Sequence, residues 1–144
     1  MEVKNVVPHS EIRRALFSWY REKCAFLLGY KRRNEFIVAA IMPTPNVTSR
    51  DPAHAYAIST SAWKRARSEA RKVGMSVIGH AHSHPNGPPW PSPLDIAYIR
   101  LGELGLVYHP RGYLVWYTSA GVICTQRERQ NVVQRLIGLL FTDS

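Results

Sequence analysis

The stretch GHAHSHPNGPPWPSPLD, residues 79–95, places three of the chain's six histidines at alternate positions and follows them with a proline-rich bend. Side chains two apart in a β-strand point to the same face, so the three histidines are expected on one side of a strand over residues 75–84. Ser92, Pro93 and Asp95 have the residue types favoured at the N-cap, first and third positions of a helix. The stretch therefore predicts a strand, a rigid turn and a capped helix in immediate succession.

This stretch also contains the donor atoms of a possible metal site. Two adjacent histidines on one strand face can share an ion, and imidazole suits zinc. A short strand cannot fold three ligands around one ion, so a third ligand must come from elsewhere, and Asp95 is the candidate. Each part also has an ordinary structural interpretation, because alternate histidines can lie on a solvated strand face and Ser-x-x-Asp is a common helix start.

The rest of the chain predicts an α/β fold around this stretch. Hydrophobic periodicity indicates a helix over residues 10–21, capped by Ser10, with a buried face that includes Trp19 and Tyr20. Strands are expected over 23–30 and 35–42, then a long loop over 43–56. A helix over 61–73, with Val73 on its apolar face, is expected to end at Gly74. Three short strands within 105–126 and a last helix, with Thr125 and Glu128 as a capping box, complete a sheet covered by helices.

Composition limits the kind of protein. A chain of 144 residues fits a single domain, residues 1–144, and no apolar run approaches the ~20 residues of a membrane span. The N-terminus lacks a signal-peptide pattern, so a cytoplasmic protein is expected. Cys24 and Cys124 lie in apolar runs and are expected as buried free thiols. The net charge of +9 favours an acidic partner, although the chain shows none of the common nucleic-acid-binding motifs.

Two motifs resemble one family of enzymes. The series His82-Ser83-His84, seven residues, Ser92, two residues, Asp95 resembles the JAMM motif of MPN-domain metalloproteases, H-S/T-H-x7-S-x2-D. Glu22 stands seven positions before Gly29, as does the upstream glutamate of that family. The chain thus resembles compact prokaryotic-type members of the JAMM/MPN+ zinc metalloproteases. The resemblance implies the MPN (JAB1/MPN, cytidine-deaminase-like) fold, with a central mixed, largely antiparallel sheet flanked by helices.

The resemblance also implies a role for each motif residue. His82, His84 and Asp95 would bind one catalytic Zn²⁺, Glu22 would act as general base and acid, and Ser92 would stabilise the oxyanion. His80 has no place in the motif and is expected as a packed or supporting residue. The other histidines, His9, His54 and His109, are expected at the surface.

The function implied is hydrolysis of the amide after the C-terminal Gly-Gly of ubiquitin or a ubiquitin-like protein, with the loop 43–56 lining the channel for that tail. Three alternatives remain open at this point. The substrate could be a sulfur-carrier protein, the chain could be a RadC-like protein associated with nucleic acid, or it could be a non-catalytic MPN scaffold. A membrane partner is not expected, nucleic acid is not favoured, and the sequence does not decide the oligomeric state.

Overall fold

A seven-stranded mixed sheet forms the centre of the computed structural model, which describes residues 1–128. The spatial order is β1-β3-β2-β4-β5-β6-β7, and only β1/β3 and β4/β5 pair in parallel. The largely antiparallel sheet that the resemblance implied is therefore confirmed. Its strands are β1 (Glu2–Asn5), β2 (Cys24–Arg32), β3 (Glu35–Thr44), β4 (Ser76–Ser83), β5 (Leu104–His109), β6 (Tyr113–Thr118) and β7 (Gly121–Arg127).

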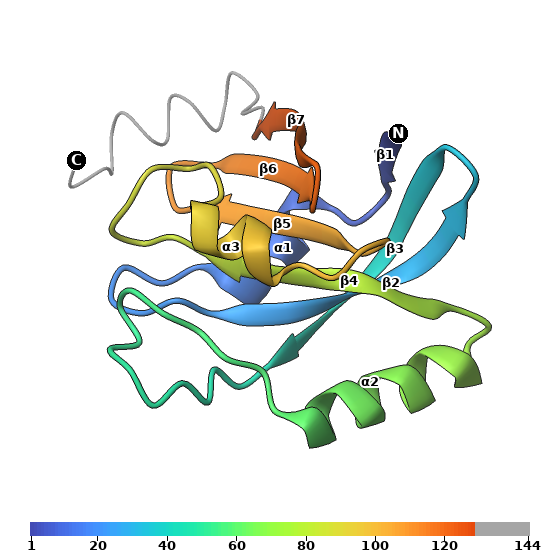
Figure 1. Ribbon diagram of the computed structural model, residues 1–144, viewed down its shortest axis with the longest axis horizontal. Helices are drawn as coiled ribbons and strands as arrows, with labels where there is room; N and C mark the ends of the chain where they lie inside the picture. The colour runs from blue at the N-terminus through green and yellow to red at the C-terminus, as the bar shows by residue number, and fades with distance from the viewer. Residues whose placement is uncertain (129–144) are drawn as a thin grey trace.

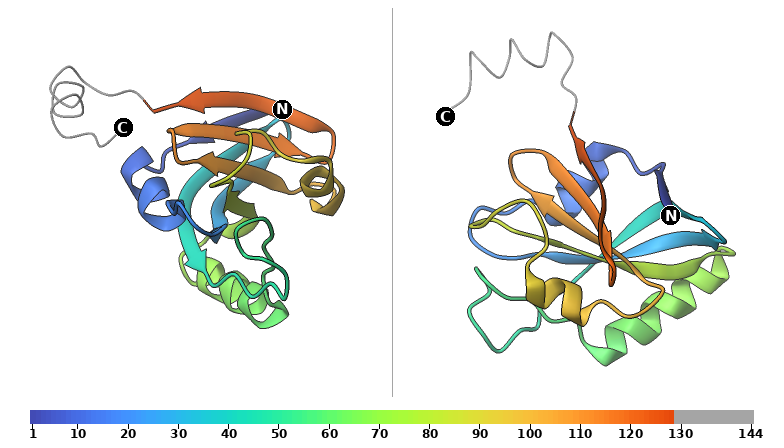
Figure 2. Two further views of the ribbon diagram at one scale, coloured as in Figure 1. Left: turned by 90° about the vertical axis from the view of Figure 1, so that its left-hand side faces the viewer. Right: turned by 45° about the horizontal axis from the view of Figure 1, so that its top comes forward.

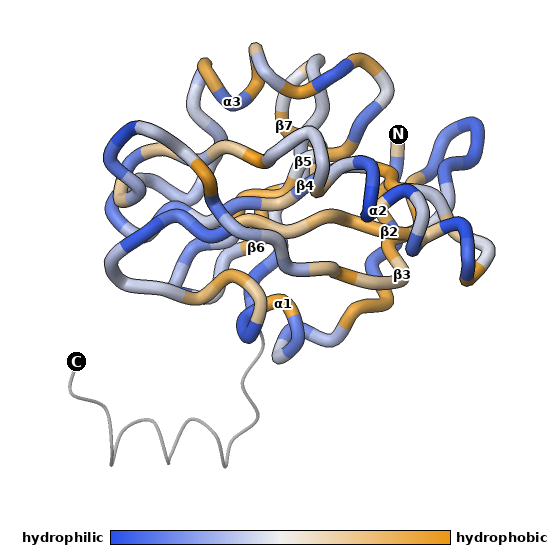
Figure 3. Tube along the Cα trace, turned by 90° about the horizontal axis from the view of Figure 1, so that it is seen from below, coloured by the Kyte–Doolittle hydropathy of each residue, from blue (hydrophilic) through white to orange (hydrophobic). Residues whose placement is uncertain are grey.

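Helices cover both faces of this sheet (Figures 1 and 2). The helix α1 (His9–Leu16) lies on one face, while α2 (Thr60–Lys72) and α3 (Pro93–Tyr98) lie on the other. Figure 3 shows α1 and α3 on opposite sides of the strands. No helix of the described part of the chain has the length and apolar character needed to cross a membrane.

The two faces are packed differently. On the α1 face, one continuous cluster joins Ile12 and Leu16 to side chains of β2 to β6, including Ala81 and Trp116. On the opposite face, the apolar residues form two separate clusters, one under α2 and one beside α3. The strand β4 runs between these two clusters, so its side chains on that face need not be apolar.

A β-bulge in β4 sorts its side chains between the two faces. Leu27 pairs with Gly79, but Leu28 pairs with Val77, so Ile78 is an extra residue in β4. Ile78 consequently joins the core on the α1 face, although an unbroken alternation would place it on the same face as His80 and His82. The bulge therefore keeps Ile78 off the face that carries His80 and His82, where Val77 packs against the cluster under α2.

The first helix is shorter than the sequence predicted. It ends at Leu16, and the predicted burial of Trp19 and Tyr20 is wrong, because these side chains are 55% and 83% exposed. The Ser18 hydroxyl accepts hydrogen bonds from the backbone N–H groups of Tyr20 and Arg21, both at 3.2 Å, and this turn replaces the helical pattern. Ser10 does not cap the helix, whose N-cap residue is Pro8.

Other element boundaries also differ from the prediction. The short strand β1 was not predicted, and Val73 is 62% exposed rather than on a buried face. Gly74 ends α2 with a positive φ of 73°, as expected. The predicted capping box at Thr125 and Glu128 is wrong, because β7 continues through Arg127 in pairing with β6. The predicted last helix falls mainly on residues 129–144, outside the described part of the chain.

Candidate active site

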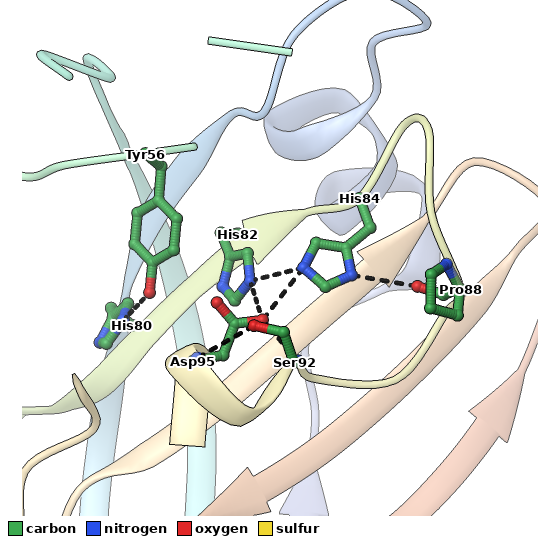
Figure 4. A network of polar contacts seen from close by, with 7 residues as sticks. All are labelled: Tyr56, His80, His82, His84, Pro88, Ser92 and Asp95. Atoms are coloured by element: carbon green, nitrogen blue, oxygen red, sulfur yellow. Dashed lines mark hydrogen bonds and ion pairs between the residues drawn. The ribbon is translucent and has the colours of Figure 1, made fainter. Parts of the chain in front are cut away.

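The end of β4, the proline-rich bend and the start of α3 meet in one polar cluster (Figure 4). Ser92 and Asp95 form the predicted cap: the Asp95 N–H donates to Ser92 Oγ at 3.1 Å, and the Ser92 N–H donates to Asp95 Oδ2 at 2.8 Å. The His84 Nδ1–H donates to the Pro88 carbonyl at 3.0 Å, since a carbonyl can only accept. This bond orients the His84 ring so that its Nε2 lies 3.1 Å from Asp95 Oδ2.

Three possible ligand atoms form a nearly equilateral triangle. His82 Nε2 lies 3.0 Å from His84 Nε2, and Asp95 Oδ2 lies 3.2 Å and 3.1 Å from these two nitrogens. Ligand atoms of a tetrahedral zinc ion lie roughly 3.3 Å apart, given Zn–N bonds of about 2.0–2.1 Å. Two imidazoles and one carboxylate are also a donor set that zinc accepts, so the residues present fit this ion.

Glu22 lies next to this triangle although it is 60 residues from His82 in the sequence. Possible ligand atoms of Glu22, His82 and His84 all lie within 4.8 Å of one another. The Ser83 hydroxyl holds the two segments together, because it accepts a hydrogen bond from the Lys23 N–H at 2.8 Å. The serine between the two histidines therefore points away from them and fixes the segment that carries Glu22.

The two carboxylates of the site have opposite electrostatic environments. Burial raises the pKa of the Glu22 carboxyl to about 7. Burial alone would also raise the pKa of Asp95, but hydrogen bonds to His82 and His84 outweigh it and hold that pKa well below its usual range. Paired carboxylates whose pKa values are pushed apart are typical of a proton carrier beside a permanently ionised group.

His80 supports the site from the neighbouring position, as expected. It is buried, and its Nε2 lies 2.7 Å from the Tyr56 hydroxyl in a hydrogen bond (Figure 4). The Tyr56 ring stacks on His82 with ring centroids 4.2 Å apart. Burial lowers the pKa of His80 to about 3, so the ring stays neutral near neutral pH. Tyr56 was not predicted, and no local pattern in the sequence identifies it.

Tyr117 is a second contact residue that the sequence did not indicate. Its ring meets His82 edge-on at 6.5 Å. The ring lies directly over Gly105, where an added Cβ would come within 2.3 Å of a ring carbon. Gly105 is therefore required for this aromatic side chain to lie beside the site.

Asn46 organises the loop between β3 and α2. Its side-chain amide donates to the carbonyls of Glu22 and Ala55, and its carbonyl accepts from the N–H groups of Thr48 and Ala57, at 2.9–3.1 Å. This one side chain thus ties the loop to the backbone of Glu22.

A single cavity of about 860 Å³ contains the site. The loop between β3 and α2 forms one wall and the start of α3 forms the other. The predicted loop 43–56 thus borders the cavity, and its role as the channel for a Gly-Gly tail stays a prediction. Glu22, His84, Ser92 and Asp95 all line it. The candidate site residues therefore border this cavity.

The remaining histidines and cysteines follow the predictions only in part. His54 is exposed, but His9 and His109 are half-buried, and the His109 Nε2–H donates to the Gly87 carbonyl at 3.0 Å in the bend. Both cysteines are free; Cys24 is buried as expected, whereas Cys124 is only half-buried.

The fold and the site together define a JAB-type domain, and comparison with known proteins agrees. A family model described as prokaryotic homologs of the JAB domain matches residues 7–135. This match covers most of the chain, and the chain therefore belongs to the prokaryotic JAB-domain family.

Individual relatives extend this comparison. The chain is 38% identical over 63 residues to a probable TtuB-protein conjugate cleaving protease of Thermus thermophilus, and the matched part is 44% of this chain and 42% of that protein. Among solved structures, a protein of Desulfitobacterium hafniense has a TM-score of 0.64 at 20% identity, covering 92% of this chain and 97% of that one. A JAB1/MPN domain protein of Archaeoglobus fulgidus has a TM-score of 0.54 at 20% identity, covering 86% and 95%. The similarities to these two solved structures establish the fold.

Proposed function

We propose that this chain is a zinc-dependent isopeptidase that hydrolyses the amide bond after the C-terminal Gly-Gly of a ubiquitin-like protein. The observation that carries the proposal is the convergence of His82, His84 and Asp95 into one triangle with Glu22 beside it. The similarity to a conjugate-cleaving protease supports the choice of a protein conjugate as substrate.

The metal would be held by His82, His84 and Asp95. Glu22, His82 and His84 form an alternative ligand group, because their possible ligand atoms also lie within 4.8 Å. We favour Asp95 as the third ligand because its Oδ2 is within 3.2 Å of both imidazole nitrogens. A zinc ion there would supply Lewis-acid activation of water and of the scissile carbonyl.

Glu22 would then carry the proton. Its buried carboxyl has a pKa of about 7, so near neutral pH it exists in both protonation states. Such a group can accept a proton from the attacking water and pass it to the leaving amine. Hydrogen bonds to the Pro52 carbonyl and from the Asn46 amide fix the main chain that carries this carboxyl.

Ser92 would stabilise the oxyanion. Its Oγ accepts the helix-capping bond from the Asp95 N–H, which leaves its own hydroxyl hydrogen available as a donor. The side chain lines the cavity, so this donor can face a bound substrate. One hydroxyl would thus both cap α3 and bind the developing negative charge.

The direct test is cleavage of defined substrates by the purified protein. Zinc-loaded protein is incubated with a panel of ubiquitin-like proteins fused through Gly-Gly to a reporter, with and without a chelator. We expect cleavage after Gly-Gly that stops on chelation and returns with added zinc, and one zinc ion per chain by elemental analysis. Absence of stoichiometric zinc, or cleavage that a chelator leaves unchanged, would contradict the proposal.

A further inference from the structure

Trp63 forms a fixed aromatic surface on the wall of the active-site cavity. Its ring packs edge-on against Phe26, with centroids 4.8 Å apart, and against His80, with centroids 5.8 Å apart. His80 is itself held by Tyr56. The orientation of the indole is therefore determined by buried neighbours.

Two guanidinium groups lie against this one ring. The Cζ atoms of Arg100 and Arg67 are 5.6 Å and 5.8 Å from the Trp63 centroid, which is within the range of cation–π contacts. Arg67 comes from α2 and Arg100 follows α3, so both elements on this face of the sheet contribute a cation. The ring restricts both side chains, and this lowers the entropy that they would lose on binding an anion.

Neither cation has a carboxylate partner in residues 1–128. The ion pairs found in that part of the chain involve other residues, all at 4.0 Å or less. Glu103 lines the same cavity as Arg100, but the bond between these two residues joins the Glu103 N–H to the Arg100 carbonyl at 3.0 Å. A guanidinium with free donors at a cavity wall suits a planar, bidentate carboxylate.

The distance along β4 relates this wall to the reaction. Trp63 contacts His80, whereas the proposed metal ligands extend to His84, four residues further on. At about 3.3 Å per residue, this separation is roughly 13 Å. Both edges of β4 are paired, and the proposed ligand His82 is only two residues from His80. A peptide crossing the cavity with its scissile amide at the proposed ligands would thus bring a side chain a few residues away to Trp63.

We propose that Arg100 on the cavity wall and Arg67, held against the same Trp63 ring, form a subsite that selects an acidic side chain a few residues from the scissile bond. This subsite rests on the proposed function, since it assigns a specificity determinant to the same cavity. A glutamate or aspartate of the substrate would bind there through charge-assisted hydrogen bonds to Arg100, and Arg67 would add electrostatic attraction.

The test is a charge scan in internally quenched peptides centred on Gly-Gly. Glutamate, glutamine or lysine is placed in turn at the third, fourth and fifth positions on either side of the scissile bond, and kcat/KM is measured. We expect one position at which glutamate is preferred over lysine by about tenfold, the scale of a single charge-assisted contact. The variant Arg100→Glu should reverse this preference, and Arg67→Glu should weaken it. The matched control is Arg14→Glu, an exposed arginine on the opposite face of the sheet, which should leave the preference unchanged.

Two outcomes would overturn the subsite. One is equal kcat/KM for the glutamate and lysine peptides at every position, and the other is a preference that Arg100→Glu leaves intact. If no peptide is cleaved, that result counts against the proposed hydrolase, and the subsite is still decided by binding. Fluorescence anisotropy of the same peptides on the Glu22→Gln protein should show the glutamate preference, and equal affinities for glutamate and lysine peptides would reject it.

Discussion

The two faces of the sheet show how one strand can serve both stability and chemistry. On the α1 face, β4 contributes Ile78 and Ala81 to one uninterrupted apolar core. On the other face, the same strand carries His80 and His82 between two separate apolar clusters. The first face is held by non-directional burial, whereas the second depends on specific hydrogen bonds and ring contacts.

This difference means that substitutions on the two faces should have separable effects. A buried apolar residue can be shortened at a cost in stability alone, because it contributes area and volume. A buried polar residue of the site contributes a particular atom at a particular place, so its loss changes reactivity first. The following predictions test that separation, beginning with the largest expected effect.

Replacing the proposed proton carrier should abolish activity without unfolding the protein. Glu22→Gln keeps the shape of the side chain but removes its ability to take a proton, so kcat/KM should fall by about 10²–10⁴-fold. Zinc content and Tm should stay near those of the unchanged protein. Glu11→Gln, an exposed acid on α1, is the control. Substantial cleavage by Glu22→Gln would remove the proposed general base.

Shortening a core residue on the opposite face should have the reverse effect. Leu16 is fully buried in α1, and Leu16→Ala should lower the free energy of unfolding by about 2–5 kcal/mol, as measured by urea denaturation. At a temperature where the variant is still folded, its kcat/KM should equal that of the unchanged protein. A large loss of kcat/KM in folded Leu16→Ala would show that the two faces are coupled.

Ser92 is expected to contribute both to stability and to reactivity, because it caps α3 and is the proposed oxyanion donor. Ser92→Ala should lower kcat/KM by about 10²–10³-fold and the free energy of unfolding by about 0.5–2 kcal/mol. Ser92→Thr keeps a hydroxyl at the N-cap and should recover most of both losses. If Ser92→Ala loses stability but keeps full kcat/KM, the residue is a helix cap and nothing more.

Of the two effects confined to stability, the smaller is expected at Tyr56, whose hydroxyl bonds to His80. Tyr56→Phe keeps the ring stacked on His82 but leaves both ring nitrogens of His80 buried without a partner. The expected cost is about 1–3 kcal/mol in the free energy of unfolding, with zinc content unchanged. Tyr30→Phe, at a half-exposed tyrosine of β2, should cost much less under the same denaturation assay. Equal costs in the two variants would show that the His80 bond does not stabilise this face.

Much of the fold was predictable because its signals are local. Alternation marked β4, and residue types two or three positions apart marked the cap of α3, since such patterns act within a few residues. The first helix was predicted too long because Ser18 offers the backbone an alternative that apolar periodicity does not register. The strand β1 was missed because four residues are too few to show a period.

The sequence by itself determined which side chains could form a metal site, because His82, His84, Ser92 and Asp95 stand at spacings set by one strand, one bend and one helix start. Glu22 was indicated by a family motif, but its position beside the histidines depends on the antiparallel pairing of β2 with β4 and on the Ser83 hydroxyl. Only the tertiary structure decided that Tyr56 covers His82 and that Asn46 ties its loop to Glu22. It also decided that a bulge turns Ile78 to the α1 face, away from His80 and His82. These contacts join residues far apart in the chain, and long-range packing, unlike helix or strand periodicity, leaves no repeating pattern in the sequence from which it could be predicted.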